Sequence, residues 1–173
     1  MLTRPVSFDY HCAGRPIYSM IAGPDKKIYG ATGIPLRVFS YDPASGKLEN
    51  HGLDDYGGHV NQWVRQGRKL YGAVYSGGEL LEYDPSRPFE DAPIGQGQNP
   101  KLAFKSAEAR DLYGRPHAVL AHPDGRHVLV GGNPARGFAG GGLLIYDTQS
   151  GQGTILTRED LVKDQGITAM TAL

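Results

Sequence analysis

Four short polar segments carry the side chains of this sequence that are best suited to chemistry. They read Gly-Arg-Pro at 14–16, Gly-Gly-His-Val-Asn at 57–61, Gly-Arg-Pro-His at 114–117 and Asp-Gln-Gly at 164–166, and each leads into an apolar run. Arginine can hold a carboxylate through two parallel hydrogen bonds, and a neutral imidazole exchanges protons near pH 7. The set therefore favours a small anionic or hydroxyl-rich ligand, such as a sugar acid. The candidate ligand-binding residues are Arg15, His59, Asn61, Arg115, His117 and Gln165.

These residues also have structural interpretations. Arg15 and Arg115 could tie neighbouring units together through backbone carbonyls, and His59 and His117 could be hydrogen-bonded core groups. The catalytic residues stay unassigned, with His59, His117 and Arg115 as candidates. The six histidines show no i, i+4 pair or other ligand spacing, so neither a metal nor a cofactor is predicted. There is also no Gly-x-Ser-x-Gly elbow and no recognisable pair of carboxylates.

An internal repeat must position these segments. Residues 22–43 align without a gap on residues 64–85 at an offset of 42, with seven identities in 22 positions. Each copy has an apolar run that ends in Tyr-Asp, and a third Tyr-Asp closes a looser copy at 121–151. A unit of this length cannot bury its own faces and must stack on its neighbours.

Each unit reads as short antiparallel strands. In the first, strands are expected at 17–22, 27–32 and 37–41, with a fourth beginning at 47–48, because β-branched, aromatic and aliphatic residues alternate with turn sequences. The segment Asp-Pro-Ala-Ser-Gly at 42–46 fits a type I turn that ends on a glycine with positive φ.

A few segments stand apart from this pattern. Only 99–112 and 157–163 carry helical signals, and both are interpreted as excursions from the β scaffold. The glycine-rich stretch 131–142 leads into a strand rather than a helix, so we expect a flexible inserted loop over one face rather than a phosphate cradle. Trp63 is expected in the core, and the repeated tyrosines, including Tyr29 and Tyr71, are expected to pack between units.

Composition limits the partners. The chain has 18 basic and 18 acidic residues among 173, with no basic stripe, which argues against a nucleic-acid partner. No run of apolar residues is long enough to span a membrane, and no signal peptide is recognisable, so no membrane partner is predicted. The 39% hydrophobic content supports a packed core in spite of 25 glycines and 12 prolines. Cys12 is the single cysteine and cannot form an internal disulfide.

The units resemble blades of a β-propeller of the broad group that includes WD40, YVTN and quinoprotein-like propellers. The resemblance rests on Pro-Asp-Gly-Arg at 123–126 and on Tyr-Asp where WD40 blades carry Trp-Asp, and it covers about residues 14–173. It implies an all-β fold of four-stranded antiparallel meanders, in contrast to a β-sandwich, in which no such repeat is required. The expected single domain, 1–173, has blades at about 14–56, 57–98 and 114–156, an inserted segment at 99–113 and the start of a fourth blade at 164–173.

Three blades and a fraction do not close a propeller, so the chain is expected to be a partial propeller or to self-associate to close a ring. In a propeller the four polar segments would converge on the channel face. The predicted function is binding or scaffolding of a small polar or carbohydrate-like ligand or a protein partner. The alternative is an enzyme that resembles the propeller polysaccharide lyases, in which Arg115 neutralises a uronic acid and His59 or His117 assists proton abstraction.

Overall fold

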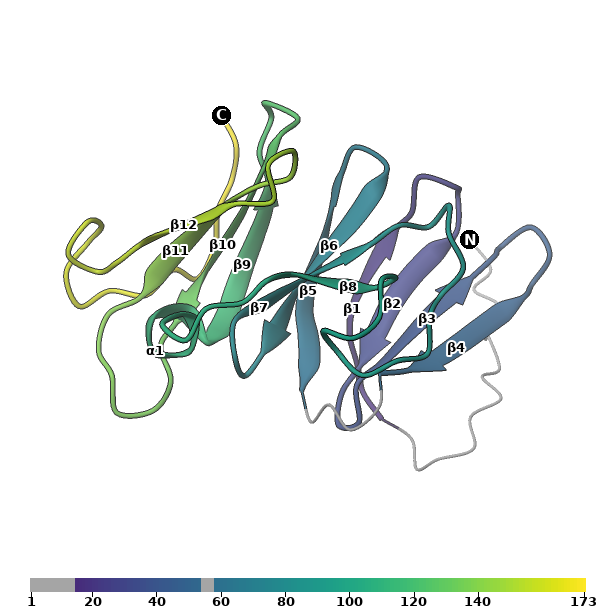
Figure 1. The fold of residues 1–173 in the computed structure, drawn as a ribbon, viewed down its shortest axis with the longest axis horizontal. Coiled ribbons are helices and arrows are strands. Elements are labelled where there is room, and N and C mark those ends of the chain that lie inside the picture. The colour runs from purple at the N-terminus through teal and green to yellow at the C-terminus, as the bar shows by residue number, and fades with distance from the viewer. Residues whose placement is uncertain (1–14, 54–57) are drawn as a thin grey trace, which may run out of the picture.

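Three antiparallel sheets of four strands each make up the fold, which we describe from a computed structural model covering residues 15–53 and 58–173. The sheets stand side by side as three propeller blades (Figure 1). The predicted blade limits at 14, 56 and 57, and with them Gly14 and Gly57, lie outside the described residues. The expected fold class, an all-β propeller of four-stranded meanders, is confirmed.

The first blade contains β1 (Ile17–Ala22), β2 (Ile28–Thr32), β3 (Arg37–Tyr41) and β4 (Leu48–Gly52) in sequential order. Two of its strands have the predicted limits, and the others differ by a residue at their first position. The turn after β3 also forms as expected. Asp42 accepts the Ala44 N–H at 2.9 Å and the Ser45 hydroxyl at 2.7 Å, and Gly46 has φ 74°.

The second blade contains β5 (His59–Gln66), β6 (Lys69–Tyr75), β7 (Glu79–Tyr83) and β8 (Lys101–Phe104). The strand β8 pairs with β7, so the fourth strand lies inside 99–113, which was expected to be an insertion after a blade ending at 98. The chain reaches it through a long loop at 84–100. The buried Asn99 organises this loop, because its amide donates to the carbonyls of Asp84, Arg87 and Pro88.

The third blade follows a short helix, α1 (Ala109–Tyr113), and contains β9 (Arg115–Ala121), β10 (His127–Asn133), β11 (Gly142–Asp147) and β12 (Gly153–Leu156). The helix occupies only the end of 99–112. The helical interpretation of 157–163 is wrong, because this segment forms hydrogen-bonded turns. The Asp160 carboxylate accepts both the N–H and the hydroxyl of Thr157, which closes the chain locally.

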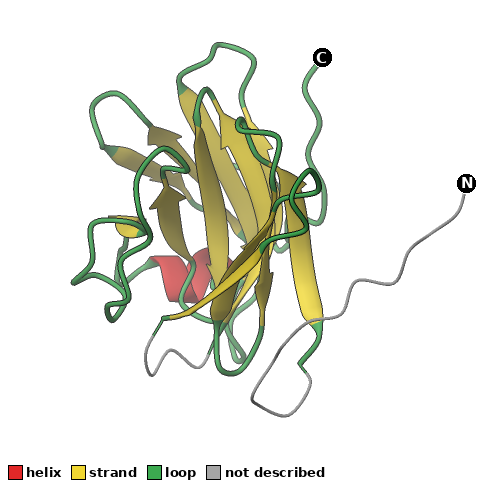
Figure 2. Cartoon of the chain, turned by 90° about the vertical axis from the view of Figure 1, so that its right-hand side faces the viewer, coloured by secondary structure: helices red, strands yellow, loops and turns green. Residues whose placement is uncertain are grey.

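The last segment runs beside the third blade. The Ile167 N–H donates to the Gly132 carbonyl at 3.3 Å, and the Ile167 side chain lies over Gly131. Residues 164–173 contain no strand, so their assignment to a fourth blade stays a prediction. Figure 2 shows the blades from the side, with α1 near one end of the strands.

Two hydrophobic cores join the blades. The first lies between blades one and two and includes the buried Trp63, as expected, and the second lies between blades two and three. Tyrosine pairs mark both interfaces: the rings of Tyr29 and Tyr83 lie 5.5 Å apart between centroids, and those of Tyr71 and Tyr146 lie 6.2 Å apart. The expectation that the repeated tyrosines pack between blades is therefore confirmed for these pairs.

The inner strands β1, β5 and β9 pack against one another in sequence. Polar side chains tie them together across the blade boundaries. The Ser19 hydroxyl donates to the Val60 carbonyl at 2.7 Å, and the Gln62 amide oxygen accepts the Val119 N–H at 3.0 Å. Since β1, β5 and β9 all begin at the same end of their blades, the polar segments that precede them share one face of the molecule. We call this face the channel face.

Candidate functional site

The site is a cavity on the channel face, at the junction of blades two and three. We call it the Arg115 pocket. It has a volume of about 470 Å³, within the usual range of ligand sites of about 300–1,000 Å³. It forms where β6 ends and β9 begins, and α1 and the loop after β10 complete it. Its lining residues are Tyr75, Ser76, Arg110, Asp111, Arg115, Ala135, Arg136 and Phe138.

Three arginines from three different segments meet in this pocket. Arg115 opens β9, Arg110 lies on α1, and Arg136 lies on the loop after β10. The α1 helix is connected to that loop because the Ala135 N–H donates to the Arg110 carbonyl at 3.0 Å. Within residues 15–53 and 58–173, no carboxylate forms an ion pair with any of the three guanidinium groups, although Asp111 shares the lining. The pocket thus carries an excess of positive charge.

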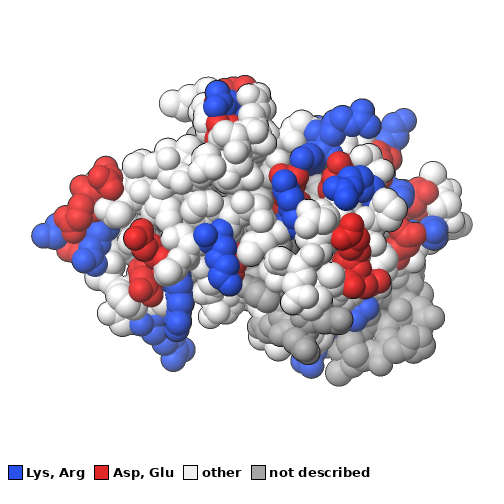
Figure 3. Space-filling view, in the orientation of Figure 1, with Lys and Arg blue, Asp and Glu red and all other residues white. Residues whose placement is uncertain are grey.

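The remaining lining gives the pocket a mixed surface. Tyr75 and Phe138 contribute aromatic rings, and Phe138 is 52% exposed, which is unusual for a phenylalanine. Ser76 adds a hydroxyl. Figure 3 shows blue side chains at the lower edge of the third blade with red side chains beside them, and charges of both signs over the other blades.

His59 lies beside this pocket in an aromatic stack. Its ring is 3.7 Å from the ring of Tyr18 and 4.8 Å from the ring of Tyr75, both nearly parallel to it. Gly33 permits this stack, because an added Cβ would lie 2.5 Å from the Tyr18 ring. Tyr75 therefore connects the His59 stack to the Arg115 pocket.

Asn61 fixes the proton of His59. Its amide nitrogen donates to the Pro116 carbonyl in the next blade, so its oxygen faces the His59 Nε2 at 2.6 Å and accepts the Nε2–H. The Nδ1 atom is then the unprotonated nitrogen, and it is buried without a partner. Burial lowers the pKa of His59 below 6.5, and the Asn61 hydrogen bond opposes this only in part. His59 and Asn61 thus serve as a neutral link between blades two and three.

The other predicted residues are dispersed. Arg15 is exposed at the first described position, and His117 is exposed on β9 and is not part of the pocket lining. Gln165 lies in a separate apolar hollow with Leu161, Val162 and Ile167. The structure therefore brings Arg115, His59 and Asn61 together and leaves Arg15, His117 and Gln165 outside that group.

Sequence reasoning missed most of the pocket. Arg110 falls in the segment interpreted as an excursion, and Arg136 falls in the glycine-rich stretch that was expected to cover one face. That expectation pointed to the correct loop. The signal that could have found both arginines is their placement in two non-repeating insertions, one before the third blade and one between its second and third strands.

Among the described residues, no three His, Cys, Asp or Glu side chains come together as a metal site requires. No helix formed by the described residues is long and apolar enough to cross a membrane.

Comparison with known proteins supports the fold. No protein-family model matches the chain, and no curated protein matches its sequence. Among solved structures, it is similar to virginiamycin B lyase from Staphylococcus aureus, with a TM-score of 0.55 and 13% identity over 82% of this chain and 41% of that one. A streptogramin B lyase gives the same score and identity and is covered to 40%.

A third similar structure is the extracellular domain of a putative hybrid two-component system from B. thetaiotaomicron. It has a TM-score of 0.58 and 20% identity, over 90% of this chain and 19% of that one. The chain therefore spans about two fifths or less of these neighbours. At these identities the likeness shows a shared β-propeller fold.

Proposed function

We propose that this chain is the ligand-binding part of a β-propeller whose Arg115 pocket holds a small anion, such as a sugar acid. The observation that supports this is the meeting of Arg110, Arg115 and Arg136 in one cavity that holds a single carboxylate. Guanidinium groups present planar pairs of donors that match a carboxylate, and they stay charged at any physiological pH.

The aromatic lining suits the body of such a ligand. Tyr75 and Phe138 offer flat apolar surfaces against which the C–H face of a sugar ring can pack, and the Ser76 hydroxyl can bond to a ring hydroxyl. Because Arg110 and Arg136 are exposed, salt should weaken the attraction.

The histidines give less support to the lyase alternative. His59 offers no free nitrogen to the pocket, because Nε2 is bonded to Asn61 and Nδ1 is buried. His117 is not part of the lining. Two of the similar structures are named as lyases, but at 13% identity those names describe their own activities.

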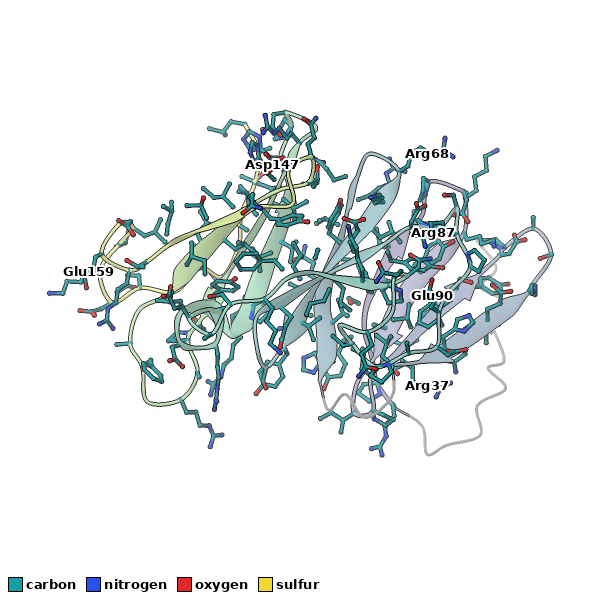
Figure 4. The ribbon with its side chains drawn as sticks, viewed as in Figure 1. Arg37, Arg68, Arg87, Glu90, Asp147 and Glu159 are labelled. Atoms are coloured by element: carbon teal, nitrogen blue, oxygen red, sulfur yellow. The ribbon has the colours of Figure 1, made fainter. Side chains whose placement is uncertain are left out.

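Binding titrations test the proposal. Glucuronate and galacturonate should bind the protein more tightly than glucose and galactose, and Arg115→Ala should reduce uronate affinity about tenfold, which equals about 1.4 kcal/mol. Arg136→Ala should act in the same direction. Arg68→Ala is the matched control, because it removes an exposed arginine from the β5–β6 turn, at the other end of the strands (Figure 4). Uronate binding that stays at wild-type strength in Arg115→Ala would overturn the proposal.

A further inference from the structure

A second cavity lies between blades one and two, and we call it the Ser40 pocket. Its volume is about 460 Å³. Lys27 precedes β2, Ser40 and Tyr83 lie near the ends of β3 and β7, and Glu49 lies near the start of β4. These positions are at the opposite end of the strands from the Arg115 pocket.

The internal repeat shows why the cavity exists. The neighbouring interface, between blades two and three, has Glu82 at the corresponding place. Glu82 is buried, and its carboxylate lies 2.5 Å from Lys69 Nζ and 3.3 Å from Lys101 Nζ, and accepts the Tyr71 hydroxyl at 3.2 Å. This cluster fills the second interface.

The strand register shows that Ser40 in blade one and Glu82 in blade two occupy equivalent positions. Tyr29 pairs with Ser40 and Ser40 with Glu49 in the first blade, and Tyr71 pairs with Glu82 and Glu82 with Lys101 in the second. Ser40 therefore replaces a glutamate, and Glu49 replaces a lysine. The shorter side chain leaves open the space that the Glu82 side chain occupies one blade later.

The charges around the Ser40 pocket are balanced by its own surroundings. The Tyr29 hydroxyl donates to Asp25 at 2.8 Å, and Lys27 lies 3.9 Å from the same carboxylate. Glu49 lies 2.7 Å from Lys47. A ligand at this site would thus gain little from carrying a net charge, in contrast to one in the Arg115 pocket.

Charged side chains are also paired on the opposite wall of the Ser40 pocket. Arg87 lies 3.8 Å from Glu90 on the loop at 84–100, and Figure 4 shows the two side by side in front of blades one and two. The loop is fixed by Asn99, which binds the Arg87 and Pro88 carbonyls. The wall is therefore an ordered part of the fold.

Aromatic rings and hydrogen-bonding groups alternate around the cavity. Tyr83 lies between Tyr29 and Phe89, with ring centroids 5.5 and 6.0 Å away. Burial raises the pKa of Tyr83 to about 12, so its hydroxyl stays a donor, and the described residues give this hydroxyl no hydrogen-bond partner. The Ser40 hydroxyl donates to the Glu49 carboxylate at 3.3 Å, and both groups keep lone pairs that can accept hydrogen bonds.

We propose that the Ser40 pocket is a second binding site, for a neutral hexose or a neutral sugar unit of a larger glycan. Apolar C–H faces would pack on the Tyr83 and Phe89 rings, and hydroxyls would bond to Ser40, Glu49 and Tyr83. This site is independent of the anion proposed for the Arg115 pocket.

The test introduces into blade one the side chains that blade two carries at the equivalent positions. The double variant Ser40→Glu/Glu49→Lys rebuilds the Lys-Glu-Lys cluster and should fill the cavity. Calorimetric titration and ligand-observed NMR with glucose, galactose, mannose and their methyl glycosides should show binding to the wild type. We expect the double variant to lose at least about tenfold in affinity. Ser40→Ala leaves the space open but removes one hydroxyl that the sugar would use, so it should lose less affinity than the double variant.

Several outcomes separate this site from the other. Neutral sugar binding should survive Arg115→Ala, and uronate binding should survive the double variant. If the double variant fails to fold, Phe89→Ala, which removes one wall, must weaken the neutral sugar instead. No binding of any neutral hexose, or wild-type affinity in the folded double variant or in Phe89→Ala, would overturn the inference. Loss of neutral sugar binding in Arg115→Ala would also overturn it, because the sugar would then sit in the Arg115 pocket.

Discussion

Asn99 should be the polar residue on which the loop at 84–100 most depends. It is 1% exposed, and its amide nitrogen donates to the carbonyls of Asp84, Arg87 and Pro88 at 3.1, 3.1 and 2.8 Å. Its oxygen accepts the Asp84 N–H at 2.8 Å. Two N–H bonds serve three acceptors, so one of them is shared. Asn99→Ala removes all of these contacts at once.

The expected loss of unfolding free energy depends on the backbone groups that Asn99→Ala leaves without a hydrogen-bond partner. The Asp84 N–H is partly buried and loses its acceptor, which costs about 1–3 kcal/mol. The carbonyls of Arg87 and Pro88 belong to exposed residues and can turn to water, so their loss adds about 1 kcal/mol in total. We expect Asn99→Ala to lower the free energy of unfolding by about 3 kcal/mol and the Tm by roughly 6–12 °C.

Urea and thermal unfolding measure this change. Asn99→Asp is the matched variant: it keeps the acceptor for the Asp84 N–H but sets a carboxylate against three carbonyls, so it should be at least as destabilising at neutral pH. Ser86→Ala removes an exposed hydroxyl that bonds to Asp84 at 2.6 Å and should cost less than about 1 kcal/mol. A loss below about 1 kcal/mol in Asn99→Ala would refute the reasoning.

Three further predictions concern charge and catalysis. Burial lowers the pKa of His59 in the folded protein below 6.5, so its contribution to stability is present above about pH 6.5 and is lost as the pH falls through the folded pKa. Urea unfolding at about pH 7.5 and 5.5 should therefore show a smaller difference in the free energy of unfolding for His59→Gln than for the wild type. Glu82→Gln should cost about 2 kcal/mol in urea unfolding, because two lysines and Tyr71 lose the carboxylate they share, and a loss indistinguishable from zero would contradict this account of the second interface. The protein should release no unsaturated product from uronate polymers in an ultraviolet assay, and turnover that disappears in His117→Ala would establish the lyase alternative instead.

Much of the blade architecture could be predicted because it depends on residues that are close together in the sequence. The strands at 17–22 and 37–41 follow from short runs of β-branched, aromatic and aliphatic residues between turn sequences, and the Asp42 turn follows from side-chain acceptors beside a glycine. The interblade tyrosines were predictable because they recur at the repeat offset. These features depend on residues close together in the chain or on the repeat itself.

The displaced strand β8 and the Arg115 pocket depend on contacts that no local pattern contains. The loop at 84–100 separates the third and fourth strands of blade two, and the hydrogen bonds between Asn99 and Asp84 hold the two ends of this loop together. Arg110 and Arg136 meet Arg115 only because α1 and the loop after β10 fold over the same strand ends. The role of Asn61 was also hidden, since its partner is a backbone carbonyl in another blade.

The tyrosine pairs give the stacking of blades a direction. At each described interface, a tyrosine of the second strand in one blade meets the Tyr-Asp tyrosine of the third strand in the next. At the two ends of the stack these positions hold different residues, Tyr41 on the first blade and Leu129 on the third. Unlike surfaces of this kind associate head to tail, and a twofold dimer through either end would set like against like. Any assembly built on these ends should therefore grow by rotation toward a closed ring rather than stop at a symmetric pair.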